Sequence, residues 1–147
     1  KMILSAQQLF SDDQAITASA ASTNYIDLGA AGTPYGAAAA MSRDIGKGNK
    51  IPLLVQVTTA FDSSADDGTL TIAIQLDSTT TFTPDATIDL GTFAEADLVA
   101  GFQIPFEVVP KDVDMRYARL YYTVAGSGNF TAGAITAGIS MGNDTNV

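Results

Sequence analysis

The sequence contains no cysteine, no histidine and no tryptophan. Without cysteine the chain forms neither a disulfide bond nor a thiolate metal site. Without histidine it lacks the commonest general base and the commonest zinc ligand. Carboxylates, lysine, serine, threonine and tyrosine are the groups left for catalysis. We therefore expect a protein that is not an enzyme and has no catalytic, cofactor-binding or metal-binding residue.

Basic residues are also scarce: seven lysines and arginines stand against sixteen acidic residues, for a net charge of −9. This charge repels the phosphate backbone of nucleic acids and the surface of anionic membranes, so neither is an expected partner. The same charge favours solubility at high concentration. No run of eighteen apolar residues exists, and the beginning, KMILSAQQLF, lacks the long apolar core of a secretion signal.

Alternation of apolar and polar residues, the signature of a half-buried strand, is what the sequence has in quantity. It is clearest in TLTIAIQL, where Leu70, Ile72, Ile74 and Leu76 share the inward face. Strands of this kind are predicted at residues 14–19, 24–29, 51–59, 69–76, 86–91, 101–109, 116–124 and 129–140. FAEADLVAG, residues 93–101, is the one place with short helical character.

Clusters of Gly, Asp, Ser, Thr and Asn separate most of these strands, as in DSSADDG and DSTTTFTPD. Another cluster, AGSGN, joins residues 116–124 and 129–140 as a predicted hairpin. About eight short strands with turn-rich connections predict an all-β fold, and in 147 residues they fit a single jelly-roll β-sandwich. We expect one domain over residues 1–147.

A long segment rich in alanine and glycine, residues 29–50, has no clear period. Loops of more than about 12–15 residues are uncommon in compact domains and are often functional. One interpretation is a helical turn through YGAAAAMSR, packed on an edge of the sandwich. The other is an extended arm that becomes ordered against a neighbour, since small side chains permit close backbone approach.

The loop DSSADDG places Asp62, Asp66 and Asp67 close together and raises the question of a calcium site. It lacks the alternating ligands and the closing glutamate of an EF-hand, so a solvated turn is the better interpretation. GKGNK, residues 46–50, has the composition of a phosphate-binding loop but not its spacing.

Two of the three arginines, Arg116 and Arg119, flank Tyr117 on a predicted strand. Alternation places Tyr117, Arg119 and Tyr121 on the face opposite Leu120. Tyrosine and arginine are enriched at the energetic centres of protein interfaces, although they also cover outer sheet faces and pair with local aspartates. The predicted interface residues, including those of the long loop, are Tyr35, Met41, Arg43, Lys47, Arg116, Tyr117, Arg119 and Tyr121.

Segments read in order along the chain resemble a known family. They are DDQAITASAASTNYIDLGAAG, RDIGKG, LLVQVTTAF with TLTIAIQLDSTTTF, and RYARLYYTVAGSGNFTAGAITAGI. Together they resemble the capsid cement, or decoration, proteins of tailed bacteriophages, typified by the Bordetella phage cement protein. In the last segment, TAGAITAG is thin enough for another sheet or subunit to approach closely.

The resemblance implies a jelly roll without catalytic residues or cofactor that is made in the bacterial cytoplasm. It would bind the outer surface of an HK97-type phage shell in the virion and bridge neighbouring capsomers. The expected partners are the major capsid protein and further copies of this chain, as a dimer or trimer. The alternative is a carbohydrate-binding or receptor-binding jelly-roll module of a virion, in which tyrosines would replace tryptophan as stacking platforms.

Overall fold

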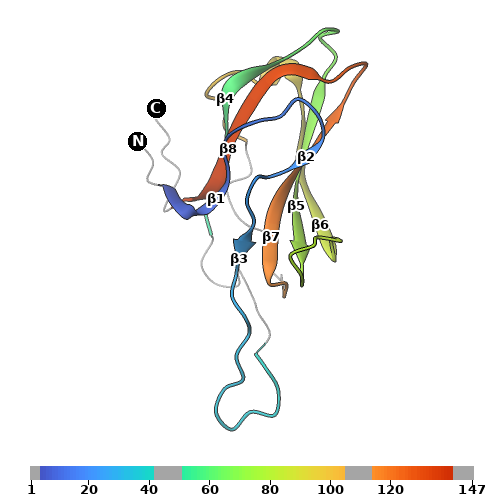
Figure 1. Ribbon diagram of the computed structural model, residues 1–147. Coiled ribbons are helices and arrows are strands. Elements are labelled where there is room, and N and C mark those ends of the chain that lie inside the picture. Colours follow the sequence, from blue (N-terminus) through green and yellow to red (C-terminus); the bar gives the residue numbers. More distant parts are fainter. Residues whose placement is uncertain (1–3, 42–50, 105–113, 141–147) are drawn as a thin grey trace.

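The computed structural model describes residues 4–41, 51–104 and 114–140, which form two facing antiparallel sheets (Figure 1). Arg43, Lys47 and the second half of the predicted strand at 101–109 lie outside the described residues. In the first sheet the order is β1 (Leu4–Ala15), β8 (Phe130–Ser140) and β4 (Leu53–Ser63).

The second sheet is built on β7 (Tyr117–Ala125), which pairs on one side with two short strands, β2 (Ala20–Ala21) and β3 (Ile26–Asp27). On its other side come β5 (Thr69–Asp77) and β6 (Ala86–Ala94). A single 3-10 turn, η1 (Glu95–Asp97), follows β6 and confirms the short helical character predicted there. Within the described ranges no helix is long and apolar enough to cross a membrane.

The pairing of the strands is nested from the ends of the chain inward. The first strand pairs with the last, β2 and β3 pair with β7, and β5 pairs with β6. The next pair inward from β2, β3 and β7 is an isolated antiparallel bridge. It joins Gln56 of β4 to Gln103, at the beginning of the predicted strand 101–109. Nested pairing in two sheets is the jelly-roll topology, so the predicted all-β sandwich of eight strands is confirmed.

The inward faces of the two sheets form the core. Leu70, Ile72, Ile74 and Leu76 of β5 are all buried, as their alternation predicts. Each fully buried aliphatic side chain of this kind contributes about 1.5–3 kcal/mol. Facing them across the sandwich are buried side chains of the first sheet, namely Phe10, Leu53, Val55, Val57, Phe61, Phe130 and Ile135.

One polar link crosses this core. The hydroxyl of Tyr122 on β7 lies 2.8 Å from the hydroxyl of Ser11 on β1, and Ser11 donates to Oε1 of Gln14 at 2.7 Å. Tyr122 is therefore the donor to Ser11. Burial raises the pKa of Tyr122 far above its usual value, with the bond to Ser11 acting in the opposite direction, so its proton stays in place.

The predicted hairpin at AGSGN was wrong. Strands β7 and β8 follow one another in the chain, but they belong to different sheets, and AGSGN crosses from one sheet to the other. Both strands carry a continuous apolar face. Because β7 and β8 lie in facing sheets, their apolar faces cover each other across the core. If the two strands paired side by side in one sheet, other strands would have to cover both faces.

One further prediction about strands was wrong. The strand at 14–19 ends at Ala15, and β1 begins ten residues earlier, in a stretch that shows no simple alternation. The thin strand TAGAITAG makes its close approaches inside the chain. A side chain at Gly133 would collide with the ring of Phe61 on β4, and one at Gly138 would lie 2.8 Å from the carbonyl oxygen of Gln8 on β1.

Candidate interaction surface

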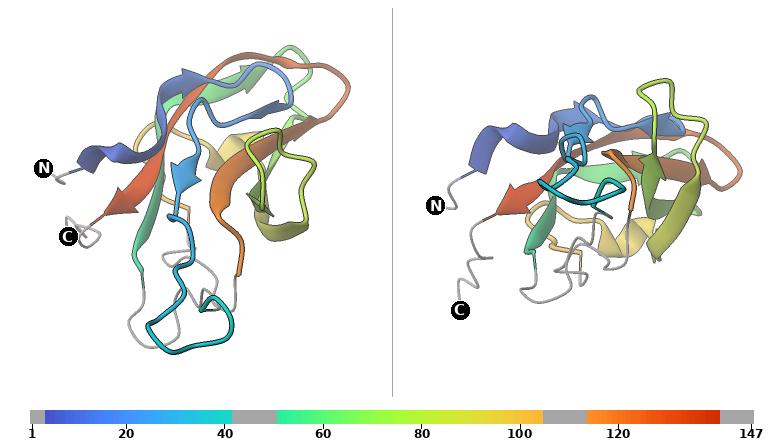
Figure 2. Two further views of the ribbon diagram at one scale, coloured as in Figure 1. Left: turned by 60° about the horizontal axis from the view of Figure 1, so that its bottom comes forward. Right: turned by 90° about the horizontal axis from the view of Figure 1, so that it is seen from below.

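An arm, defined here as residues 29–41, leaves the end of β3 and projects beyond the sandwich (Figures 1 and 2). Every residue from 30 to 41 is exposed, and Tyr35 near the tip is 110% exposed. Two backbone hydrogen bonds fold the arm on itself, from Ala37 to Pro34 and from Met41 to Gly32, each at 3.0 Å. The described half of the long loop is therefore an extended arm, without the helical turn of the other interpretation.

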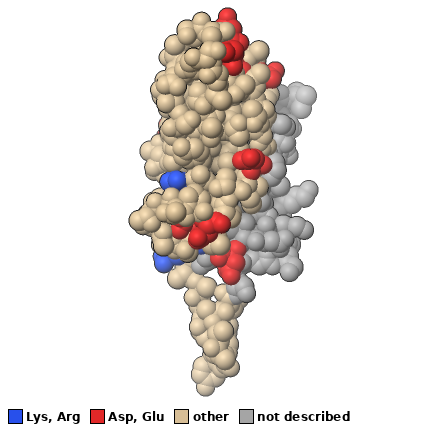
Figure 3. Space-filling model, turned by 90° about the vertical axis from the view of Figure 1, so that its right-hand side faces the viewer, with Lys and Arg blue, Asp and Glu red and all other residues tan. Residues whose placement is uncertain are grey.

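No charged side chain occurs in the arm, although the rest of the chain is strongly acidic. Figure 3 shows the arm free of both charge colours, with acidic groups spread over the sandwich, some of them beside the basic groups above the base of the arm. Of the seven basic residues, only Arg116 and Arg119 lie in the described ranges. The arm therefore presents small and apolar groups, including the exposed side chains of Tyr35 and Met41.

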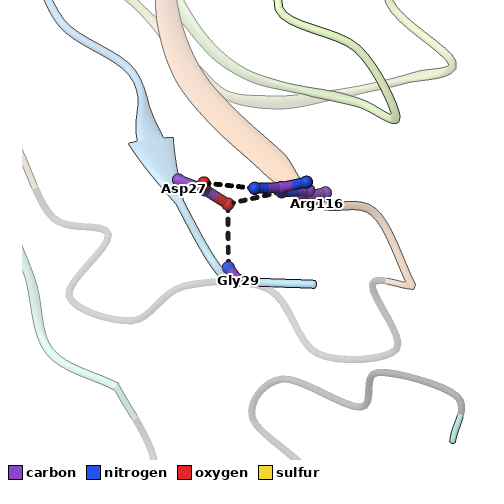
Figure 4. A network of polar contacts seen from close by, with 3 residues as sticks. All are labelled: Asp27, Gly29 and Arg116. Atoms are coloured by element: carbon purple, nitrogen blue, oxygen red, sulfur yellow. Dashed lines mark hydrogen bonds and ion pairs between the residues drawn. The ribbon is translucent and has the colours of Figure 1, made fainter. Parts of the chain in front are cut away.

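The base of the arm is fixed to β7 by Asp27 and Arg116 (Figure 4). Nε of Arg116 donates to Oδ1 of Asp27, and a terminal guanidinium nitrogen donates to Oδ2, both at 2.9 Å. The same carboxylate accepts the amide of Gly29 at 2.9 Å. These bonds raise the pKa of Arg116 further, the hydrogen bond to Asp27 being the main cause. A planar, paired contact of this kind fixes direction as well as distance.

Backbone hydrogen bonds continue the attachment on both sides of Asp27. The amide of Leu28 donates to the carbonyl of Arg116 at 2.8 Å, and the amide of Ser22 donates to the carbonyl of Leu120 at 2.8 Å. The hydroxyl of Ser22 also accepts the amide of Leu120. The two segments that carry the family resemblance most clearly, STNYIDLG and RYARLYY, thus lie against each other.

Beside this anchor, aromatic side chains gather around Arg119 on the outer face of the second sheet. The guanidinium of Arg119 lies 4.3 Å from the centroid of the Phe82 ring and 6.0 Å from that of Tyr121. The ring of Tyr25 meets the ring of Tyr117 edge to face, with 5.5 Å between the centroids. The ring of Phe82 is tilted against that of Tyr25, with 5.8 Å between the centroids. We call Tyr25, Phe82, Tyr117, Arg119 and Tyr121 the arginine–aromatic patch.

The connection between β5 and β6 supplies Phe82 to this patch. Asp77 begins the turn, accepting the amide and the hydroxyl of Thr79 at 2.6 and 2.9 Å. Phe82 adopts a left-handed backbone conformation, with φ of 48°, which is unfavourable for a bulky residue. The residue is only 8% exposed, and its ring lies beneath the guanidinium of Arg119, so the turn places an aromatic ring in the sheet's outer face.

Arg119 is held in place on the sheet as well. Its Nε donates to Oε1 of Gln75 at 2.8 Å, on the neighbouring strand and directly opposite in register. In the described ranges it forms no ion pair, in contrast to Arg116. The guanidinium is therefore a positioned cation that contacts a neutral amide and aromatic rings, and no carboxylate of the described ranges neutralises it.

Six of the eight predicted interface residues fall in two places. Arg116, Tyr117, Arg119 and Tyr121 lie together at the base of the arm, while Tyr35 and Met41 lie on the arm itself. The remaining two, Arg43 and Lys47, are outside the described residues. Tyr25 and Phe82 were missed because each lies on another segment of the chain, far in sequence from the β7 residues that it contacts. Phe82, an aromatic residue inside the turn-rich segment DSTTTFTPD, was the one feature of the sequence that could have indicated this part of the patch.

At the opposite end of the sandwich, carboxylate oxygens of Asp62, Asp66 and Glu95 lie within 4.8 Å of one another. Those of Glu95 are already occupied, because they accept the amide and hydroxyl of Ser63 at 2.7 and 2.5 Å and the amide of Gly68 at 3.2 Å. These bonds, the Ser63 hydroxyl foremost, hold the pKa of Glu95 below its usual value. The carboxylate thus closes the turn between β4 and β5.

A family model named Bbp16 matches residues 10–139 of the chain. No curated protein matches the sequence of this chain. The matched range contains β2 to β7 entirely, the second half of β1 and nearly all of β8, so it includes the base of the arm, the arm itself and the arginine–aromatic patch. The chain belongs to the Bbp16 family, a name that suggests a Bordetella phage protein.

Proposed function

We propose that the protein is a structural cement protein of a phage capsid. It binds the outer surface of an HK97-type shell, contacts the major capsid protein and bridges neighbouring capsomers. The observation that carries this proposal is the arm, an exposed and uncharged segment that is anchored at its base by Asp27 and Arg116. Membership of the Bbp16 family and the resemblance of the sequence to phage cement proteins support it.

Ordering the arm costs conformational entropy, which contacts with a partner would offset. The arm's residues from 30 to 41 are all exposed, so they bury little surface against their own chain, while ordering a backbone costs about 1–2 kcal/mol per residue. An apolar segment of this kind gains stability when it enters a groove of another protein. A tyrosine such as Tyr35 supplies about 150–250 Å² of contact on burial.

A rigid sandwich with such an arm reaches across a boundary between subunits. A ligand that binds the assembled shell but not the separated subunits stabilises assembly by RT ln(1 + [L]/Kd), about 2.7 kcal/mol at a hundredfold excess over Kd. Because the sites repeat with the symmetry of the shell, moderate affinity at each one is sufficient.

The distribution of charge fits this role. The chain carries a net charge of −9, so identical molecules crowded on a shell repel one another except where their surfaces are uncharged or basic. The arm is uncharged, and the patch at its base holds Arg119. Contacts through these two surfaces avoid most of the repulsion.

Binding to shells before and after expansion tests the proposal. Purified protein is mixed with each kind of shell and sedimented, and we expect it to pellet with expanded shells. Ala38→Asp introduces a charge in the arm and should weaken binding. Thr87→Asp makes the same change in charge on the exposed face of β6 and should not. Failure of the unmodified protein to bind expanded shells would refute the proposal.

A further inference from the structure

We propose that the arm of one copy docks on the arginine–aromatic patch of a second copy, and that the contact is reciprocal about a two-fold axis. The inference deepens the proposed function by naming one of the two partners that a bridging protein requires. It rests on the position, charge and chemistry of the arm and the patch, and it is tested in solution without a shell.

The positions of the two surfaces favour a two-fold arrangement. The patch lies at the base of the arm, because Tyr117 is opposite Asp27 in the β3–β7 register and Tyr25 precedes Asp27 by two residues. Tyr35 lies at the far end. When two arms run antiparallel, the tip of each reaches the base of the other, and one operation forms both contacts. Such an isologous contact closes as a dimer.

The chemistry of the two surfaces is complementary. The patch offers the half-exposed side chain of Tyr25, the partly exposed side chains of Tyr117 and Tyr121, and the cation of Arg119, which forms no ion pair with a described residue. A tyrosine ring packs edge to face on aromatic rings and beneath a guanidinium, and its hydroxyl stays at the rim. Alanines and glycines on either side of Tyr35 let the backbone of the arm approach the sheet closely.

Electrostatics selects this contact over others between copies. Each copy has a net charge of −9, and acidic groups are spread over the sandwich (Figure 3). The patch contains Arg119 and lies next to Arg116, which is paired with Asp27, while the arm carries no charge. Joining arm to patch therefore brings an uncharged segment against a surface that holds a cation, which adds no repulsion between like charges.

Another route to self-association, pairing through the free edge of β6, is less suitable. The outer edge of β6 has Asp89 near its middle, so a two-fold copy would place two carboxylates close together. A register shift beside Gly91, whose φ is 152°, also interrupts the strand. Edge strands with a charge and a bulge are protected from pairing.

Sedimentation of the full chain over a range of concentrations tests the contact. We expect a reversible dimer, weakened at least about tenfold by Tyr35→Ala and by Arg119→Ala, as for central interface residues. Val99→Ala truncates another exposed apolar side chain, away from the arm, and should leave the dimer unchanged. Because Tyr35 is completely exposed, its truncation leaves the fold intact, and circular dichroism verifies this for each variant.

The absence of cysteine makes a direct test of proximity possible. Protein with Tyr35→Cys is mixed with protein carrying Tyr121→Cys under mild oxidation. We expect a mixed disulfide to form faster than the disulfide of either protein with itself, and faster than one with Val99→Cys protein. Equal rates in all mixtures would overturn the inference.

The two proposals fail separately. A chain that is monomeric at all concentrations, or a dimer that tolerates both Tyr35→Ala and Arg119→Ala, refutes the arm-to-patch contact even if the protein binds shells. A dimer that depends on Tyr35 and Arg119 supports the contact even if the protein ignores expanded shells, in which case the cement function is refuted.

Discussion

Asp27 and Arg116 form a paired, charged hydrogen bond, with both N–O distances 2.9 Å, at the point where the chain leaves β3 for the arm. The two residues are 89 positions apart in the sequence. Their contact gives the arm a fixed origin on the second sheet, next to the patch that we propose as its docking surface in a second copy.

Asp27→Ala should loosen the base of the arm and leave the sandwich folded. The change removes both bonds to Arg116 and the acceptor for the amide of Gly29. We expect the amide of Leu28 to exchange its hydrogen about tenfold faster, while amides of β5 keep their protection. Asp89→Ala, on the exposed face of β6, is the control. Unchanged exchange at Leu28 would show that the backbone pairing alone holds the arm.

Ser11 and Tyr122 should be energetically coupled. Tyr122→Phe leaves Ser11 bonded to Gln14 and should lower the free energy of unfolding by about 1 kcal/mol. Ser11→Ala leaves a buried hydroxyl without a partner and should cost about 1–3 kcal/mol. The double variant should be close to Tyr122→Phe, whereas independent side chains would give the sum. Tyr121→Phe, on the outer face, is the control in these urea titrations.

Glu95 should contribute stability that acid removes. Its pKa is lowered in the folded protein from the usual 4.5, chiefly by the Ser63 hydroxyl. The contribution is therefore complete above about pH 4.5 and is lost as pH falls through the lower, folded-state pKa. Glu95→Gln should melt at a lower temperature at pH 7, and the difference should shrink in acid. Asp97→Asn, in the same turn, provides the comparison; a gap independent of pH would contradict the assignment.

Gly133→Ala should destabilise the first sheet strongly. At φ of 140° the residue lies where side chains are unfavourable, and a β-carbon would collide with Phe61. Backbone strain and overpacking together predict a loss of about 2–4 kcal/mol in denaturant titrations. Gly32→Ala, in open space on the arm, should be nearly neutral. Equal effects of the two changes would mean that the sheet adjusts around position 133.

The sequence pattern was a good guide where a strand keeps one face in the core without interruption. In β5, Leu70, Ile72, Ile74 and Leu76 are buried as alternation predicts, although Ala73 on the opposite face is buried as well. In β1 it failed, because shifts in register between Leu9 and Ser11 and between Ser11 and Gln14 break the period of two. The face of a bulged strand changes along its length, and this is decided by the neighbouring strand.

The candidate surface was predictable only in part, for a related reason. The alternation that buries Leu120 also places Tyr117, Arg119 and Tyr121 on the outer face, so those residues could be identified. Phe82 reaches the patch through a left-handed turn, and Tyr25 through a crossing segment fixed by Ser22 and Asp27. These placements depend on contacts between distant segments, which a local pattern does not contain.

The thermal stability of whole capsids is the sharpest test of the proposed cement function. Expanded shells are heated with and without the purified protein, and the temperature at which they release packaged DNA is recorded. We expect a higher release temperature for shells carrying the protein, and a smaller increase with the Ala38→Asp variant. Equal release temperatures with and without saturating protein would contradict the cement function.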